Sequence, residues 1–217
     1  MNRVETMSPS DRRVIFYHAP QSRSAGVRAL LEELGADYEL HALNLKTGQT
    51  REPAYLAINP MGKVPAIVHL GSLITEQSAI YQYLADLYPE AGLAPQMGDP
   101  LRGPFLRWLA FYGSSFEPAV TDKAMKRDPA PPSMCPYGDF DTMMATIEAQ
   151  LSAGPYILGD RFTSADVLWG LALKWMLGFG LVDGTPVVKA YVERIGSRPK
   201  IVAAAKADAE LAAAQQA

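Results

Sequence analysis

The sequence has few of the residues that build covalent cross-links and metal centres. Cys135 is the one cysteine among 217 residues, so neither an internal disulfide nor a C-x-x-C pair is available. The histidines at 18, 41 and 69 are scattered and show no ligand spacing. We therefore expect no metal, and we note that so little cysteine fits a reducing compartment.

Strong charge of one sign and long apolar runs are also lacking. The net charge is -3, and no cluster of Lys or Arg stands out, which argues against nucleic acid or an acidic membrane surface as a partner. No apolar stretch is long enough to span a bilayer, and residues 1–12 lack the apolar centre of a signal peptide. The sequence thus predicts a cytoplasmic protein.

The first half of the chain alternates strand and helix patterns. Residues 14–17 form a β-branched and aromatic run that predicts a strand, and apolar residues at helical spacing over 27–34 predict a helix that stops at Gly35. This order predicts a small mixed sheet covered by helices, an α/β domain over residues 12–88. The other expected elements are strands at 38–45, 64–70 and 73–74, a helical turn at 53–57 and a helix at 77–87.

The second half shows no strand signal. Proline, glycine and alanine gather at 89–100, which indicates a linker. We expect an all-helical domain over residues 101–217, in which Pro118 interrupts the first helical region. Its expected helices cover 101–126, 140–151, a segment starting at a capping box at 163–166, 186–194, and an alanine-rich tail from 201 that frays.

Two hydroxyls lie in the predicted loop between the first strand and the first helix. Ser22 and Ser24 sit where free backbone amides and the helix dipole favour an anion. A hydroxyl that donates a hydrogen bond to a thiol favours the thiolate. Either serine alternatively serves only as a helix cap, and the residues alone leave both interpretations open. We interpret His18 as a strand-end contact and not as a base.

Two further segments carry possible ligand groups. A cis bond before Pro65 would present the Val64 backbone to an extended peptide, although a strand-edge turn is the simpler account. Lys63 either binds a ligand carboxylate or is solvated. Glu76 and Gln77 precede a helix, where an acidic group is either a cap or a partner for a ligand ammonium group.

In their order and spacing, these segments resemble the soluble glutathione transferase family of bacterial type. The resemblance extends from Val14 to about Val202. It implies a thioredoxin-like α/β domain that binds glutathione, an all-α domain that lines an electrophile pocket, and a homodimer. The segments that carry it are SRSAGVRALLEELG at 22–35, NPMGKVPAI at 59–67, TEQSAIYQYL at 75–84 and GDRFTSAD at 159–166.

The resemblance also implies roles for individual residues. The Val64 backbone would pair with the cysteinyl part of glutathione beside a cis Pro65, with Lys63 near the glycyl carboxylate. Glu76 and Gln77 would hold the γ-glutamyl end, although the family usually has serine at the position of Gln77. For activation of the thiol the candidates are Ser22 first, Ser24 second, and then Arg23 or a backbone amide.

The predicted function is attachment of the glutathione thiolate to small apolar electrophiles. An aromatic group on the first helical region is predicted to wall the electrophile pocket, in part as core or dimer contacts. The alternatives are a glutathione-dependent peroxidase or isomerase, or a non-catalytic binding protein that keeps the fold. The aromatic candidates are Phe105, Trp108, Phe111, Tyr112 and Phe116.

Overall fold

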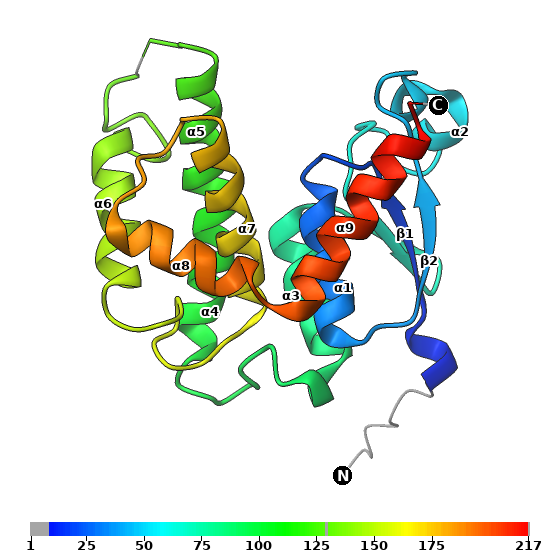
Figure 1. Cartoon of the computed structure of the whole chain (residues 1–217), viewed down its shortest axis with the longest axis horizontal. Helices are drawn as coiled ribbons and strands as arrows, with labels where there is room; N and C mark the ends of the chain where they lie inside the picture. The colour runs from blue at the N-terminus through cyan, green and yellow to red at the C-terminus, as the bar shows by residue number, and fades with distance from the viewer. Residues whose placement is uncertain (1–8, 129, 217) are drawn as a thin grey trace.

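The computed structural model describes residues 9–128 and 130–216. Figure 1 shows a small sheet with its helices beside a bundle of helices. The strand order is β2-β1-β3-β4, with β1 parallel to β2 and the other pairs antiparallel. This confirms the predicted mixed sheet. Its strands are β1 Val14–His18, β2 Tyr38–Ala42, β3 Ala66–His69 and β4 Ser72–Ile74.

The helices of this first half arise from the apolar spacing read in the sequence. α1 (Ser24–Leu34) buries its apolar residues and ends at Gly35, whose φ of 65° requires a residue tolerant of the left-handed region. α3 (Gln77–Leu87) packs beside it. The shorter elements are α2 Pro53–Leu56 and the 3₁₀ turns η1 Pro9–Arg12, η2 Gln49–Arg51 and η3 Pro89–Ala91.

The second half is helical, as predicted. Pro118 does not break the first helical region, because a π-helical segment, η4 (Tyr112–Phe116), joins α4 (Arg102–Phe111) to α5 (Glu117–Ala124) and leaves the proline in the first turn of α5. The alanine-rich tail forms α9 (Pro199–Ala214). The remaining helices are α6 Phe140–Leu151, α7 Ser164–Gly178 and α8 Pro186–Gly196.

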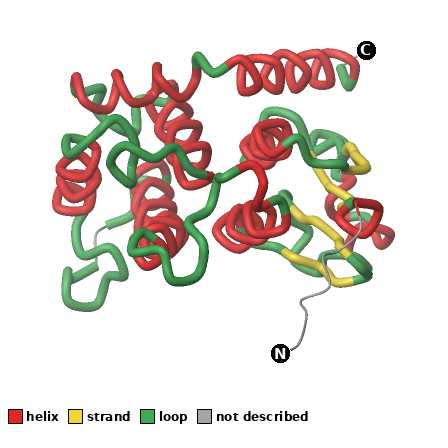
Figure 2. The backbone as a smooth tube through the Cα atoms, turned by 90° about the horizontal axis from the view of Figure 1, so that it is seen from below, coloured by secondary structure: helices red, strands yellow, loops and turns green. Residues whose placement is uncertain are grey.

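A continuous apolar core joins the two halves. Trp108 and Trp169 meet edge to face at its centre, and the indole N–H of Trp169 donates to the carbonyl of Trp108 at 3.1 Å. α9 then returns to the first half and lies along α1 (Figures 1 and 2). Among the described residues, no helix combines the length and apolar character needed to cross a membrane.

Candidate functional site

The loop from β1 to α1 holds two hydroxyls in different environments. Ser24 is fully buried, whereas Ser22 is half-buried. Both hydroxyls donate to the carbonyl of Ala19, at 2.8 Å from Ser22 and 3.0 Å from Ser24. Their oxygens lie 2.7 Å apart, and the backbone N–H of Ser24 donates to the Ser22 oxygen at 3.1 Å. Of the two, Ser22 is therefore the hydroxyl that a ligand can reach.

A buried histidine lies below these hydroxyls. His18 is fully buried, and its Nδ1 is 2.8 Å from Ser24 Oγ. Its Nε2 lies 3.0 Å from Oδ1 of Asp208 on α9, in a mainly electrostatic contact because the ring N–H is not aligned with the carboxylate. The other Asp208 oxygen accepts from the backbone N–H of Gln21 at 3.0 Å. The prediction for His18 thus missed its partner Asp208, which no local sequence signal marks.

The carboxyl of Asp208 is ionised more readily than an ordinary aspartate. Burial raises its pKa, but the contact with His18, the N–H of Gln21 and the charge of Arg28 together outweigh burial. The net result is a pKa below the usual range. Asp208 is therefore a carboxylate at neutral pH.

Arg23 is engaged with the helical half. Its guanidinium donates twice to the Glu117 carboxylate, at 2.7 and 2.6 Å, and lies 5.4 Å from the ring centre of Trp175. The hydrogen bond to Glu117 is the main cause of a raised Arg23 pKa, against the effect of burial. The Tyr112 hydroxyl also contacts Glu117, and burial first, then this carboxylate, raises the pKa of Tyr112. Arg23 is thus held by Glu117 at the edge of the site.

The predicted peptide-binding segment lies next to the end of β1. The peptide bond between Val64 and Pro65 is cis, as predicted. Because Tyr17 pairs with Ala66, the residues just before β3 lie beside the start of the loop from β1 to α1 (residues 19–23), called the serine loop below. The carbonyl of Lys63 accepts from Tyr55 and Asn59 at 2.6 and 2.8 Å. No other described residue hydrogen-bonds to the backbone of Val64, which leaves both of its groups available.

The start of α3 joins this arrangement through Gln77. Its side-chain amide donates to the carbonyl of Arg23 at 3.2 Å and accepts from the Tyr112 hydroxyl at 3.0 Å. Glu76, at the N-cap, has a φ of 62° and an exposed side chain. A glutamate in this sparsely populated region is a backbone feature that clusters at functional sites.

A cavity of about 800 Å³, called the main cavity below, opens between α1, α7 and α9. Ser22, Arg23, Gln77 and Tyr112 line its polar side. Trp175 also lines it. Gln21, Lys174 and Asp208 also line it. The rest of its lining is mainly apolar or small residues, among them Gly26, Ala29, Leu168, Leu171, Phe179, Ile201 and Ala204.

Most of the aromatic candidates lie in the apolar core. Of the five aromatic candidates, Tyr112 alone lines the main cavity. Phe105, Trp108 and Phe116 are buried in the core, and Phe111 packs on Trp108 and Trp169. The helical spacing showed a stripe of aromatic residues but not which structure that stripe faces.

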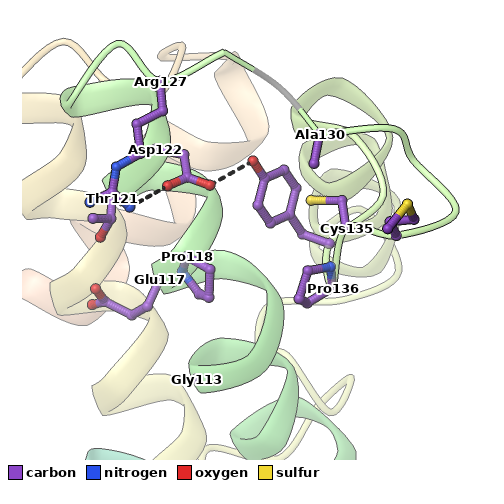
Figure 3. A pocket seen from close by; sticks show the side chains of 11 residues that line it. Gly113, Glu117, Pro118, Thr121, Asp122, Arg127, Ala130, Cys135 and Pro136 are labelled. Carbon is purple, nitrogen blue, oxygen red and sulfur yellow. Dashed lines mark hydrogen bonds and ion pairs between the residues drawn. The ribbon is translucent and has the colours of Figure 1, made fainter.

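A second cavity, of about 510 Å³, lies between α5 and residues 130–137 (Figure 3). Asp122 there accepts from Arg127 at 2.9 Å and from the Tyr137 hydroxyl at 3.0 Å. Cys135 lines this cavity, whereas Ser22 lines the main cavity. The Cys135 thiol therefore lies away from the serine loop. In the described part of the chain, no group of His, Cys, Asp and Glu is arranged to hold a metal ion.

Comparison with known proteins identifies the family. The model of the glutathione S-transferase N-terminal domain matches residues 13–86, and that of the C-terminal domain matches residues 137–194. A maize protein, glutathione S-transferase 3, is 30% identical over 186 residues, which are 80% of this chain and 84% of that one. The chain belongs to the glutathione S-transferase family of enzymes. GstA of Escherichia coli O157:H7 is 27% identical over 89% of this chain and 98% of its own.

Solved structures agree with this transferase assignment. A glutathione transferase from Methylococcus capsulatus superposes with a TM-score of 0.76 at 32% identity and covers 90% of this chain and 98% of its own. A sphingomonad glutathione S-transferase complexed with glutathione gives a TM-score of 0.74 at 30% identity, with the same coverage. The predicted family and two-part fold are therefore confirmed.

In this glutathione transferase, three segments selected from the sequence lie together. The serine loop follows β1, the segment with Lys63, Val64 and Pro65 leads into the neighbouring β3, and Gln77 connects the start of α3 to Arg23. Ser22 and Gln77 line the main cavity, whereas Lys63, Val64 and Glu76 are not among its lining residues. Lys63 and Glu76 are exposed.

Proposed function

We propose that this transferase binds glutathione and attaches its thiolate to small apolar electrophiles. The observation that carries the proposal is the environment of Ser22. Its oxygen accepts the N–H of Ser24, it is half-buried, and it lines the main cavity. Its hydrogen is donated to the carbonyl of Ala19 at 2.8 Å in this structure, and rotation of the hydroxyl would direct that hydrogen to a thiolate in the cavity.

The chemistry of glutathione fits the remaining groups. The unpaired N–H and carbonyl of Val64 match the backbone of its cysteinyl residue, as in strand addition. The exposed ammonium of Lys63 suits the glycyl carboxylate. The exposed carboxylate of Glu76 suits the γ-glutamyl ammonium group, while the first amides of α3 suit its carboxylate. A sphingomonad relative was solved in complex with glutathione, which supports glutathione as the ligand.

The proposed reaction needs an ionised sulfur and an apolar partner. The pKa of a free thiol is about 8.5, so a drop of roughly two pKa units makes the thiolate dominant at neutral pH. The thiolate then forms a C–S bond with the electrophile. In a substitution reaction, the leaving group takes the electrons of its broken bond. In an addition reaction, the product takes a proton from water. Leu168, Leu171 and Trp175 provide an apolar wall for the electrophile.

The proposal assigns these tasks to two parts of the chain. Residues 12–88 form the glutathione-binding domain, residues 89–100 the linker, and residues 101–217 the helical domain that contributes most of the electrophile's contacts. We infer a cytoplasmic homodimer from the family resemblance. The continuous core between the two halves supports the idea that they act as one catalytic unit.

A titration of the bound thiol tests the role of Ser22. Thiolate absorbance of the glutathione complex is recorded against pH, with the S-methylglutathione complex as the blank. Ser22→Ala is expected to raise the pKa of the bound thiol by about one to two units and to lower kcat at neutral pH by about tenfold or more. An unchanged thiol pKa and full activity in Ser22→Ala would refute the assignment of Ser22.

Steady-state kinetics test the binding residues. Glu76→Gln is expected to raise KM for glutathione by about tenfold with little change in kcat. The reason is that the variant loses a charge-assisted contact made equally in the bound ground state and in the transition state. Glu193→Gln, the same change at an exposed residue of α8, is the control and is expected to behave like the wild type. A wild-type protein that takes up no glutathione at millimolar concentration would overturn the proposed function.

A further inference from the structure

A chain of polar groups runs from Asp208 on α9 to the hydroxyl of Ser22 in the serine loop. Asp208 Oδ1 lies 3.0 Å from His18 Nε2, and His18 Nδ1 lies 2.8 Å from Ser24 Oγ. Ser24 Oγ in turn lies 2.7 Å from Ser22 Oγ. His18 and Ser24 are fully buried and Asp208 is buried too, so exchange with water does not reorder this chain as it does surface contacts.

The hydrogen-bonding capacity of each group gives the chain a direction. A carboxylate accepts only, so the ring nitrogen facing Asp208 carries a hydrogen. If Nδ1 also donates, Ser24 Oγ accepts from His18 and from the N–H of Ala19, which lies at 3.1 Å. Both of its lone pairs are then used, and its own hydrogen must be donated.

The same reasoning applies one step further along. Ser22 Oγ accepts from the backbone N–H of Ser24, and it also accepts from the Ser24 hydroxyl when that hydroxyl turns toward it. Its hydrogen then has two possible acceptors, the carbonyl of Ala19 and a sulfur in the main cavity. Each donor polarises the next, which strengthens the last bond of the chain.

We propose that His18 and Asp208 are positioning residues that act through Ser24 to hold Ser22 as a hydrogen-bond donor to the glutathione thiolate. No proton is transferred along the chain. The carboxylate of Asp208 holds the His18 ring at Nε2, and the ring in turn orients the two hydroxyls through Nδ1. α9, at the far end of the sequence, is therefore part of the active site.

The second oxygen of Asp208 holds the loop itself. It accepts from the N–H of Gln21 at 3.0 Å, and Gln21 has a φ of 55°, a region that non-glycine residues rarely adopt. The guanidinium of Arg28 on α1 also acts electrostatically on this carboxylate. One carboxylate thus supports both the shape of the loop and the direction of its hydroxyl chain.

This inference rests on the proposed function, and the same titration of bound glutathione tests it. Asp208→Asn keeps the size of the side chain and an acceptor for Gln21 but removes the charge facing His18. We expect a rise of about one unit in the pKa of the bound thiol, with KM for glutathione changed less than about threefold. The expected loss of kcat, about fivefold to tenfold at pH 6.5, should disappear at alkaline pH, where the thiol ionises without help.

A second variant and a matched control separate this role from simple support of the fold. His18→Asn retains an amide near Ser24 but is too short to reach Asp208, and we expect it to raise the thiol pKa as Asp208→Asn does. Glu210→Gln makes the same kind of charge change on α9, at an exposed residue 3.9 Å from Lys206. It is expected to leave the thiol pKa at the wild-type value.

The double variant Ser22→Ala/Asp208→Asn decides whether the effect passes through Ser22. If it does, the double variant has the thiol pKa of Ser22→Ala alone, because the link to sulfur is already lost. Additive shifts, or a wild-type thiol pKa in Asp208→Asn, would overturn the inference. In either case a raised thiol pKa in Ser22→Ala would leave the proposed function intact, whereas a wild-type value in Ser22→Ala would reject the role of Ser22 itself.

Discussion

At the scale of single residues, Gly26 permits the close approach of α1 to Tyr81. A Cβ at this glycine would lie 2.6 Å from the Tyr81 hydroxyl and 3.8 Å from the nearest ring carbon. Tyr81 is fully buried, and its hydroxyl has no hydrogen-bond partner among the residues that the structure describes. The hydroxyl is therefore the atom that a larger residue at position 26 would have to displace.

A double-mutant cycle tests this packing. We expect Gly26→Ala to reduce the free energy of unfolding by about 1–3 kcal/mol through overpacking. Tyr81→Phe alone should change it by no more than about 1 kcal/mol, because the hydroxyl makes no hydrogen bond to another described group. The double variant should recover most of the loss, as measured by urea denaturation. A double variant no more stable than Gly26→Ala would show that the clash lies elsewhere.

At the scale of elements, the start of α7 depends on one buried carboxylate. Asp166 completes the predicted capping box with Thr163. It also accepts from the N–H of Ile157 at 2.7 Å and from the Tyr191 hydroxyl at 2.9 Å. Burial raises its pKa, and the hydrogen bonds from these neighbours oppose that effect. The box therefore connects α7 to α8 and to the segment before α7, beyond its role as a local cap.

Removal of this carboxylate should cost more than loss of an ordinary cap. Asp166→Ala leaves several buried donors unpaired, and we expect a loss of about 3–5 kcal/mol in the free energy of unfolding. Asp139→Ala at the exposed start of α6, where Asp139 accepts from the N–H of Thr142 at 2.8 Å, is the control. Its expected cost is about 1 kcal/mol. Equal losses in urea denaturation would contradict the additional role of Asp166.

At the scale of the whole molecule, α9 joins the end of the chain to its beginning. Asp208 contacts His18 at the end of β1 and the N–H of Gln21 in the loop that follows. Arg198, just before α9, donates twice to Glu33 of α1, at 2.7 and 2.9 Å. These contacts hold α9 against α1 and close one side of the main cavity.

The pH dependence of stability should reveal the contribution of Asp208. Its folded-state pKa is lowered, so its stabilising effect is present above the unfolded value of about 3.9 and is lost as the pH falls through the lower folded value. In urea denaturation, the wild type should exceed Asp208→Asn by a constant margin above about pH 5. The margin should shrink below about pH 4, and a constant margin down to pH 2 would contradict the shift.

Much of this arrangement followed from local patterns in the sequence. The strands, α1, α3 and the α7 capping box appeared close to where they were expected, because side-chain period and capping chemistry act within a few residues. The cis bond before Pro65 was implied by the family resemblance and is present in the structure. The family resemblance rested on the order of such local segments.

Other features depended on contacts between distant parts of the chain. The stripe on α4 and η4 was visible as aromatic, but packing decided that Phe105, Trp108 and Phe116 belong to the core. Trp108 and Phe116 pack against Trp169 there. Trp175 on α7 lines the main cavity. Helical spacing defines which residues share a face, whereas the neighbouring elements decide whether that face meets the core or a cavity.

The sequence by itself determined the two-part architecture, the family and the segments that bear the candidate ligand groups. Only the tertiary structure brought Asp208 to His18 and Gln21, across 187 residues from the latter. An aspartate in an alanine-rich helix resembles any solvated charge until the helix is packed. The physical reason is that propensity, capping and turn chemistry are local, while the partner of a buried charge is set by how the finished elements pack.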